Sequence, residues 1–174
     1  AGGYHSLALK SDGSVAAWGI NVSGECTIPS GLTGVVGVAA GGSHSLALKS
    51  DGTAAAWGGN FWGQCNVPAD LTQVVAVAAG ISHSLALKSD GTAAAWGRND
   101  YGQCDIPPGL TNVVTVAAGG YHSLALKSDG NLVAGGNNAF GQCHVHHLAG
   151  LAAGRYHSLA LKADGIVPAW GDDY

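Results

Sequence analysis

The amino-acid sequence predicts an all-β protein built as a β-propeller, and three observations lead to this prediction. One motif recurs at a fixed spacing along the whole chain, short segments alternate with a period of two residues, and no segment is long enough for a stable helix. Helices shorter than about 12 residues are marginal in water, and here Gly, Pro or a Ser-Asp-Gly turn interrupts every run before that length. A stacked β-solenoid is the alternative, although its coils usually have shorter periods and no reversing hairpin.

The repeat is strict. Copies of the string HSLALK begin at His5, His44, His83, His122 and His157. The first four copies lie 39 residues apart, and the last follows after 35. The units that begin at Ala40 and Ala79 are identical at 29 of 39 positions. We therefore expect a single repeat domain, 1–174, with units at approximately 1–39, 40–78, 79–117, 118–152 and a partial unit at 153–174.

Each unit contains the elements of a small antiparallel sheet. In one unit, residues 74–79 form a β-branched and small-residue run that predicts a buried strand, and residues 83–88 alternate large and small side chains as a strand does. Residues 89–91, Ser-Asp-Gly, predict a hairpin turn, and residues 92–96 a returning strand. The polar loop at 97–107 could hold a fourth, irregular edge strand.

The composition of the strands indicates that both faces of each sheet are covered. Leu85 and Leu87 point to one face, Ser84 and Ala86 point to the other, and the remaining strands are apolar or small throughout. A free-standing antiparallel sheet would alternate apolar with polar residues. Sheets that pack against neighbours on both sides, with about one sheet per 39 residues, describe the blades of a propeller.

The repeated pattern G-x-x-H-S-L-A-L-x-x-D-G-x-x-x-x-W-G-x-N-x-x-G-Q resembles the regulator of chromosome condensation repeat, in a compact bacterial-style form, over essentially the whole chain. The resemblance implies a propeller that commonly has seven blades. It also implies relatives that act as guanine-nucleotide exchange factors, or as inhibitors that grip an enzyme with aromatic loops. The guanine-nucleotide exchange activity of these relatives is not predicted for this chain, because the sequence has no wedge segment inserted between repeats and no basic face for chromatin.

This chain holds about five hairpin units, so three arrangements are open. The ring has about five blades, the chain is a piece of a larger ring, or several chains complete one ring as a homo-oligomer, because an open end would expose an apolar blade face. The chain opens at Ala1 and contains no Met, which fits a processed product or part of a longer sequence. The compartment stays open, with a secreted or cell-surface location favoured.

The residues that recur in every unit are interpreted as scaffold. The histidine before each middle strand is expected to bond turn backbone groups that would otherwise be buried without a partner. The Cys of each loop is expected to be a small buried side chain and not half of a disulfide, because equivalent residues of adjacent blades lie about one sheet spacing, roughly 10 Å, apart. The Asp of each Ser-Asp-Gly turn is interpreted as a turn former, flanked by a Lys.

The residues that differ between units are the candidate binding residues. They lie within the N-x-x-G loops and in the strip before each histidine, and aromatic side chains among polar neighbours are typical interface anchors. The candidate partner-binding residues are Phe61, Trp62, Arg98, Asp100, Tyr101, Phe140, Tyr4, Tyr121, Arg155 and Tyr156. Packing of these rings against adjacent loops is the competing interpretation.

The amino-acid composition limits the classes of partner that we expect. Only 10% of the residues are charged, with seven Lys and Arg against eleven Asp and Glu, so a basic field for nucleic acid is not expected. No apolar run approaches the ~20 residues of a membrane span. His144, His146 and His147 break the repeat and are weak candidates for a metal site.

We therefore expect a non-catalytic module that presents the variable aromatic loops of a rigid propeller to a protein partner, in a mode that could be inhibitor-like. No cofactor is expected. A carbohydrate-binding propeller, with Trp62, Tyr101 and Phe140 stacked on sugar faces, is the alternative. A metal-dependent enzyme built on the histidine cluster is a third hypothesis. No nucleophile, base and orienting partner appear together outside the repeated positions.

Overall fold

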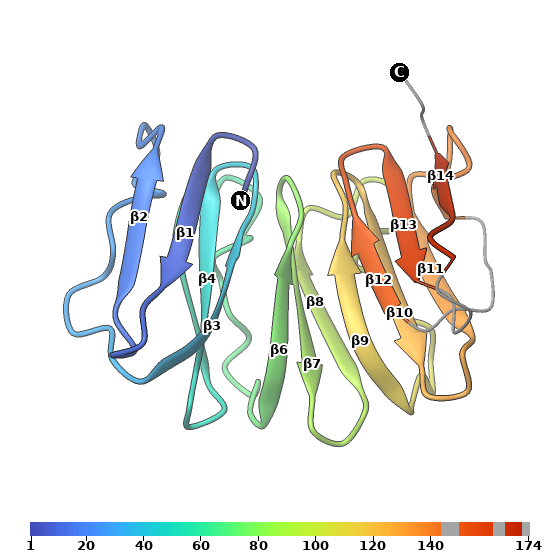
Figure 1. Ribbon diagram of the computed structural model, residues 1–174, viewed down its shortest axis with the longest axis horizontal. Coiled ribbons are helices and arrows are strands. Elements are labelled where there is room, and N and C mark those ends of the chain that lie inside the picture. The colour runs from blue at the N-terminus through green and yellow to red at the C-terminus, as the bar shows by residue number, and fades with distance from the viewer. Residues whose placement is uncertain (144–149, 162–165, 172–174) are drawn as a thin grey trace.

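A computed structural model describes residues 1–143, 150–161 and 166–171, and these fold into five small antiparallel sheets (Figure 1). The first sheet has two strands, β1 (His5–Leu9) and β2 (Val15–Gly19). The other four sheets have three strands each: β3 (Val35–Ala40), β4 (His44–Lys49) and β5 (Ala54–Gly58); β6 (Val74–Ala79), β7 (His83–Lys88) and β8 (Ala93–Gly97); β9 (Val113–Ala118), β10 (His122–Lys127) and β11 (Leu132–Gly136); β12 (Gly150–Ala153), β13 (His157–Leu161) and β14 (Ala169–Gly171). We number these sheets blade 1 to blade 5. The all-β prediction is confirmed.

In blades 1 to 4 the middle strand is joined to the outer strand by the predicted Ser-Asp-Gly hairpin. In blade 2 the Asp51 carboxylate accepts hydrogen bonds from the backbone N–H and the hydroxyl of Thr53, at 2.9 and 2.6 Å. Lys49 pairs with the same carboxylate at 2.7 Å. Gly52 has a φ of 77°, a conformation that glycine adopts without a side-chain clash. The Asp is a turn former, as the sequence predicted.

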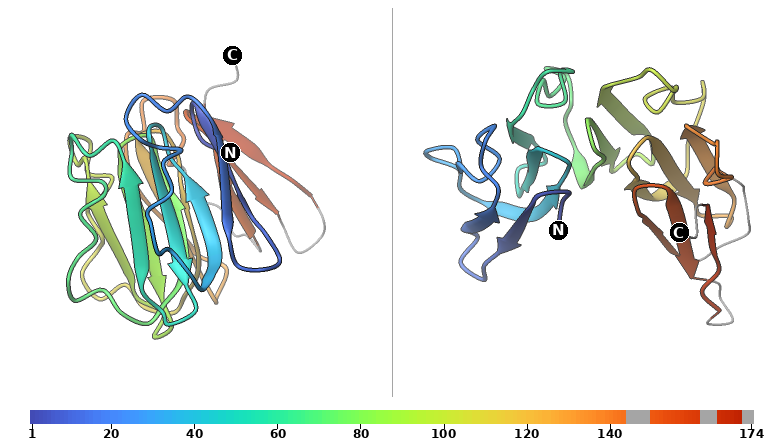
Figure 2. Two further views of the ribbon diagram at one scale, coloured as in Figure 1. Left: turned by 90° about the vertical axis from the view of Figure 1, so that its left-hand side faces the viewer. Right: turned by 90° about the horizontal axis from the view of Figure 1, so that it is seen from above.

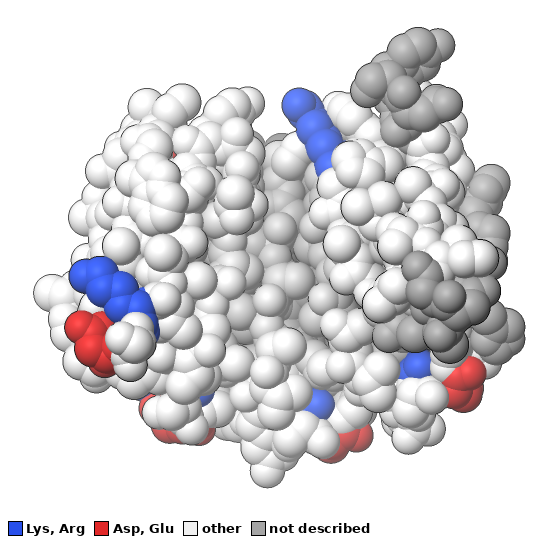
Figure 3. Space-filling model, viewed as in Figure 1, with Lys and Arg blue, Asp and Glu red and all other residues white. Residues whose placement is uncertain are grey.

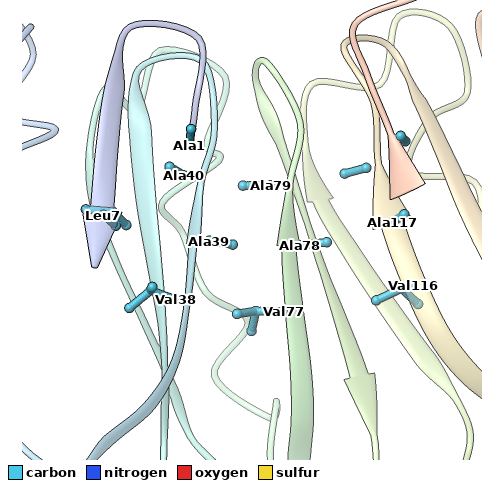
Figure 4. Close-up of a pocket in the computed structure, with 12 residues that line it drawn as sticks. Ala1, Leu7, Val38, Ala39, Ala40, Val77, Ala78, Ala79, Val116 and Ala117 are labelled. Carbon is cyan, nitrogen blue, oxygen red and sulfur yellow. The ribbon is translucent and has the colours of Figure 1, made fainter. Parts of the chain in front are cut away.

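The five blades stand side by side around an arc, and their first strands face its axis (Figure 2, right). Strands β3, β6, β9 and β12 line a central channel of about 270 Å³, and Val38, Val77 and Val116 project into it (Figure 4). These strands are almost entirely Val, Ala and Gly, which allows close approach at the axis. The arrangement is that of propeller blades, and it confirms the predicted architecture.

The hydrophobic core lies between blades. Leu46 and Leu48 of blade 2 pack with Val74 and Trp96 of blade 3, and Leu71 from the intervening loop closes the same cluster. Each of these five side chains is at most 8% exposed. Because one blade is too thin to bury an apolar face alone, each sheet is stabilised chiefly by its neighbours.

A buried hydrogen-bonded unit joins each blade to the next. The His44 Nε2 atom lies 3.0 Å from the Ser84 hydroxyl, which donates to the backbone carbonyl of Gln64 at 2.8 Å. The Trp96 indole N–H donates to the same carbonyl at 2.9 Å. The Ser84 hydroxyl has one proton, which it donates to the Gln64 carbonyl, so the hydroxyl oxygen must accept a hydrogen bond from His44. The imidazole of His44 therefore carries its proton on Nε2.

The same unit recurs at the other blade junctions. The histidine-to-serine pairs are His5 with Ser45, His44 with Ser84, His83 with Ser123 and His122 with Ser158, at 2.8 to 3.0 Å. The prediction that these histidines bond turn backbone was therefore wrong in its partner: each reaches the serine of the next blade. The structural role that the sequence assigned to them is retained.

The loop that follows each outer strand contains no strand of its own at residues 98–112, so the expected fourth edge strand was wrong. Its polar groups are used within the loop instead. The Asn99 side chain accepts from the Cys104 backbone N–H at 2.7 Å and donates to Asp105 at 2.7 Å. Because side chains satisfy these groups locally, the loop does not need to join the sheet.

Replacing Ser84 by Ala should lower the free energy of unfolding by about 2–3 kcal/mol, because it leaves the buried His44 N–H without an acceptor. Urea denaturation measures the change. Ser6 is the matched control, since it occupies the equivalent position in blade 1 and has no preceding blade in the described residues. Ser6→Ala should change stability by less than about 0.5 kcal/mol. Equal losses in the two variants would contradict this account.

The stability of the protein should fall as the pH is lowered from about 6.5 towards 4. Burial lowers the pKa of His44, His83 and His122 from 6.5 to about 4 in the folded protein. The unfolded chain therefore binds these protons first, and the loss is roughly 1–2 kcal/mol per histidine at pH 5. The hairpin carboxylates act in a separate window, below their ordinary pKa of 3.8. Urea denaturation midpoints that stay constant from pH 7 to pH 5 would contradict buried neutral imidazoles.

Candidate functional site

The candidate binding residues lie at one end of the blades, where each outer strand passes into its loop and each middle strand begins. We call this end the upper face, because it is at the top in Figure 1. The hairpin turns lie at the opposite end, and their Lys and Asp side chains gather towards the lower edge in Figure 3. Three Lys–Asp ion pairs are formed at these turns within the described residues.

A buried glutamine positions the variable residues in each of the loops that follow β5, β8 and β11. In the loop after β5 the Gln64 side-chain oxygen accepts from the Trp62 backbone N–H at 2.9 Å. Gln103 holds Tyr101 and Gln142 holds Phe140 in the same way, each at 2.9 Å. These glutamines are at most 4% exposed. The backbone of the loop is therefore anchored in the core while its side chains project outwards.

The loops bring most of the candidate residues into one continuous cluster. The Arg98 guanidinium carbon lies 4.5 Å from the centre of the Trp62 ring and 5.6 Å from that of Tyr121. Tyr121 stacks on Tyr156 with ring centres 6.2 Å apart, and Phe140 meets Tyr156 edge-on at 5.8 Å. We call this set, with Phe61, Tyr101 and Arg155, the aromatic ridge. It draws residues from the loops and strips of blades 2 to 5.

The ridge is ordered by its own contacts but remains open to solvent. Arg98 is fixed by a 2.7 Å ion pair with Asp100, so Asp100 acts as an anchor for the guanidinium. Phe61 is 88% exposed and rests edge-on against Trp62 at 5.2 Å. Trp62, Tyr101 and Phe140 are 41–50% exposed. The side chains of the ridge therefore both contact one another and remain partly exposed to solvent.

Arg155 is the other cation of the ridge. Its guanidinium lies 5.0 Å from the centre of the Tyr156 ring, and a hydrogen bond with Tyr121 raises its pKa. No carboxylate lies within ion-pair distance of Arg155 among the described residues. The chain contains only two arginines, and both stand in this cluster against aromatic rings, which reduces their conformational freedom before any partner arrives.

The ridge borders a broad cavity of about 890 Å³ at the upper mouth of the central channel. Its floor is made of small residues from the strips before each histidine, including Gly42, Ser43, Gly80 and Gly120. Tyr4, which is 60% exposed, lines the cavity from blade 1, opposite the ridge. The side-chain groups offered there are aromatic rings, hydroxyls, amides and one guanidinium.

The sequence interpretation missed the residues that hold the ridge in place. Gln64, Gln103 and Gln142 were included in the repeat pattern but were given no role. Their signal is the G-Q pair that follows the two variable positions in three of the four loops. In the first loop Glu25 takes the place of glutamine, and its carboxylate accepts from the Ser23 backbone N–H at 2.7 Å. Ser23 and Asn60, which also line the cavity, were not selected either.

Two other sequence hypotheses concern Cys and His. The four cysteines are free, as predicted, and are half-buried. Each Sγ lies 3.2–3.3 Å from the backbone carbonyl of the residue six positions earlier.

The weak metal candidates His144, His146 and His147 lie outside the described residues. Among the residues that are described, no three His, Cys, Asp or Glu side chains are grouped as metal ligands would be.

Comparison with known proteins identifies the repeat. The sequence profile of the regulator of chromosome condensation (RCC1) repeat matches residues 1–25, 35–64, 74–103 and 113–142. The chain belongs to the RCC1 repeat family. The first match covers β1 and β2, and each of the other three covers all three strands of one blade and the loop as far as its glutamine. The family pattern therefore includes the histidine, the serine and the glutamine of the hydrogen-bonded unit described above. A search of curated proteins finds no match to the chain.

Solved structures share the fold over nearly the whole chain. Prp20p from Saccharomyces cerevisiae, whose crystal structure is described together with its binding to Gsp1p and histones, is 27% identical with a TM-score of 0.82. The ectodomain of the receptor kinase CR4 from Physcomitrella patens is 22% identical with a TM-score of 0.82. The ACR4 ectodomain from Arabidopsis thaliana is 22% identical with a TM-score of 0.77.

These structures are longer than the chain described here. The RCC1-repeat chain is covered to 98–100%, but it spans 56% of Prp20p, 50% of the CR4 ectodomain and 64% of the ACR4 ectodomain. The two receptor ectodomains support the fold alone. None of the described residues forms a helix long and apolar enough to cross a membrane.

The thiols of Cys65, Cys104 and Cys143 should react slowly with iodoacetamide at pH 8. Burial raises their pKa from 9.0 to about 11, so the thiolate fraction falls by about 100-fold. Mass spectrometry of the alkylated protein measures the rate at each site. The same protein in urea, where burial is lost, is the control and should react at the ordinary rate. Fast alkylation of the folded protein would contradict the protonated, carbonyl-bonded thiols.

Proposed function

We propose that this RCC1-repeat chain is a non-catalytic binding module that presents the aromatic ridge to a protein partner. One observation carries the proposal: Trp62, Arg98, Tyr121 and Tyr156, from four different loops, meet in one exposed cluster on a single face. Trp, Tyr and Arg are the residue types that most often dominate protein interfaces. All four of these residues are held on the repeated blades, which form a rigid scaffold.

The order within the ridge supports tight binding at low entropic cost. A flexible side chain that becomes immobile on binding loses about 0.5–1.5 kcal/mol of conformational entropy. Arg98 is already held between Asp100 and two aromatic rings, and the loop backbone is tied to buried glutamines. Binding would therefore order few groups that are not ordered already.

The charge of the ridge indicates the chemistry of the partner. Arg98 is neutralised by Asp100, but Arg155 has no carboxylate partner among the described residues. Arg155 stands at the edge of the 890 Å³ cavity between aromatic rings. We infer that the partner inserts an apolar side chain against Phe61 and Trp62 and places an acidic group against Arg155. A loop or chain end of an enzyme could do so, which would be an inhibitor-like mode.

The carbohydrate alternative is less well supported by the geometry. A sugar ring stacks on the flat face of an aromatic side chain. Arg98 lies over the Trp62 ring, and Tyr121 stacks against Tyr156, so these faces are at least partly occupied. Phe61 offers a free ring but meets Trp62 only by its edge. A protein surface, which can contact ring edges and guanidinium groups together, fits this arrangement better.

The sequence relationship to Prp20p also supports a protein partner, because that protein binds Gsp1p and histones. Neither of these partners is carried over to this chain, which spans 56% of Prp20p. The seven Lys and Arg of this chain, against eleven Asp and Glu, give a net charge of −4, which does not favour binding to nucleic acid. The partner is expected to be recognised chiefly by the ridge.

Removal of one ridge side chain should abolish capture of the partner. The chain, immobilised and exposed to an extract of its source organism, should retain a protein that Trp62→Ala loses. We expect at least about a 30-fold loss of affinity, equivalent to 2 kcal/mol, once the captured protein is purified and titrated by calorimetry. Thr53→Ala, at a hairpin turn of the opposite end, is the matched control and should bind normally.

The same two variants separate the alternatives on a glycan array. Saturable sugar binding by the native chain that is lost in Trp62→Ala would replace the protein-binding proposal with the carbohydrate one. Capture of the same protein by the native chain and by Trp62→Ala with equal affinity would show that the ridge is not the site.

A further inference from the structure

Blade 4 lacks the tryptophan that the neighbouring blades place at their junctions. Its outer strand, β11, has Gly135 opposite Ser123, whereas the outer strand of blade 3 has Trp96 opposite Ser84. Blades 3 and 5 stand on either side of blade 4, so this difference lies inside the arc. The junction between blades 3 and 4 is therefore built without an indole.

The indole has a defined place in the other junctions. Trp57, Trp96 and Trp170 each donate the indole N–H to a backbone carbonyl of the loop from the preceding blade, at 2.9–3.0 Å. The rings of Trp57 and Trp96 are packed between blades and are only 7% and 8% exposed. Three junctions thus hold the same aromatic ring in the same hydrogen bond.

The missing ring leaves hydrogen-bonding capacity unused at Gln103. The Gln103 backbone carbonyl accepts from the Ser123 hydroxyl at 2.6 Å, whereas the Gln64 carbonyl accepts from both Ser84 and Trp96. A carbonyl oxygen has two lone pairs, so it can accept a second donor. The side-chain Nε2 of Gln103 has no partner in the part of the chain that the structure describes, and this residue is 2% exposed.

A cavity lies between blades 3 and 4 at the place that the indole takes in the neighbouring junction. Apolar side chains that pack with Trp96 include Leu46, Val67 and Leu71. Their counterparts, 39 positions later in the sequence, all line the cavity: Leu85, Ile106 and Leu110. Gln103 and Gly135 line it as well. The repeat therefore identifies this cavity as the vacant indole position.

The space is only partly filled by neighbouring side chains. Ile106 and Val133 stand where the junction between blades 2 and 3 has the smaller Val67 and Ala94. An enclosed volume of about 40 Å³ remains. One water molecule needs roughly 10–15 Å³ of such space, so the cavity has room for more than one. A side chain could begin at Gly135, since an added Cβ would lie 3.2 Å from its nearest neighbour.

The cavity also continues into apolar surface that is open to solvent. Leu110 is half-buried and Pro107 is exposed, whereas their counterparts Leu71 and Pro68 are buried and half-buried. Both Leu110 and Pro107 line the cavity. A ring can therefore enter from this side, with its inner edge in the enclosed volume and its outer part over these two residues.

We propose that the cavity between blades 3 and 4 binds a free planar aromatic molecule with a ring N–H, of which indole is the simplest. The ring N–H donates to the Gln103 carbonyl, and the ring packs between Leu85 and Leu124. The unpaired Gln103 amide favours members of this class that also carry an acceptor oxygen. None of the aromatic-ridge residues lines this cavity, so the site is separate from the proposed protein-binding surface.

A free molecule fits this place better than a side chain of a partner protein. An indole seated like those of Trp57 and Trp96 keeps less than a tenth of its surface exposed, which leaves little room for a partner's main chain beside it. In those junctions the ring is attached to the outer strand of its own blade. In blade 4 the same strand passes the cavity at Gly135 and is paired with β10.

NMR titration of the intact chain with indole tests the proposal. We expect saturable shifts of the Gln103 and Ser123 signals with a Kd of about 0.1–1 mM, which is within the limits for a small ring. Intermolecular NOEs should join indole to the methyl groups of Leu85 and Leu124. Benzofuran has a similar shape but no N–H, and should bind about three- to tenfold more weakly because it gives the Gln103 carbonyl no donor.

Two variants locate the site. Gly135→Trp supplies the ring from the chain itself, and should weaken indole binding at least about tenfold and raise the urea midpoint. Trp62→Ala removes an exposed ring of the aromatic ridge on which indole could stack, and it is the control that should bind indole as the native chain does. The NOEs of the native chain decide the location of indole even if Gly135→Trp does not fold.

Any of four results would overturn the proposal. They are the absence of saturable indole binding, NOEs that place indole on the aromatic ridge, equal affinity for indole and benzofuran, and a folded Gly135→Trp variant that binds indole as the native chain does. None of these results bears on the protein partner of the ridge, because capture of that partner is tested by Trp62→Ala, which leaves the cavity intact.

Discussion

The contact between one blade and the next is the constraint on which the rest of this structure depends. A single small sheet of Val, Ala and Leu cannot bury both of its faces, so each blade must be covered on both sides. The apolar clusters between blades supply buried area, but buried area alone does not fix the alignment of one blade against the next. The His44–Ser84–Gln64 unit does so, because the imidazole N–H of His44, the Ser84 hydroxyl and the Gln64 carbonyl are all paired only in one alignment.

This constraint explains which residues repeat and which vary. Histidine, serine, tryptophan and glutamine recur because each is part of the junction or holds the loop that reaches it. The loop positions beside the glutamine are not part of the junction, and they differ from blade to blade. A ridge of four aromatic loops with two arginines can therefore change its chemistry without disturbing the scaffold. Recognition at the upper face and stability between blades are carried by separate residues.

Much of the fold followed from the sequence, because strand period, Ser-Asp-Gly turns and the 39-residue spacing are local signals. The partner of each histidine did not follow, since Ser45 lies 40 residues from His5 and only the packing of blades brings them together. The fourth strand expected at 97–107 failed because Asn99 satisfies the loop backbone itself. For the site, the candidate residues were selected by variation, but the approach of Arg98 to Trp62 and Tyr121 depends on the curvature of the arc, which no spacing encodes.

The most direct test is an NMR measurement of the imidazole nitrogens of the native protein at neutral pH. Long-range proton–nitrogen correlation distinguishes a nitrogen that carries a proton from one that does not. We predict that His5, His44, His83 and His122 are neutral, with the proton fixed on Nε2 and a bare Nδ1. Imidazoles that are charged, that carry the proton on Nδ1, or that average between tautomers as exposed rings do would contradict the junction on which the account rests.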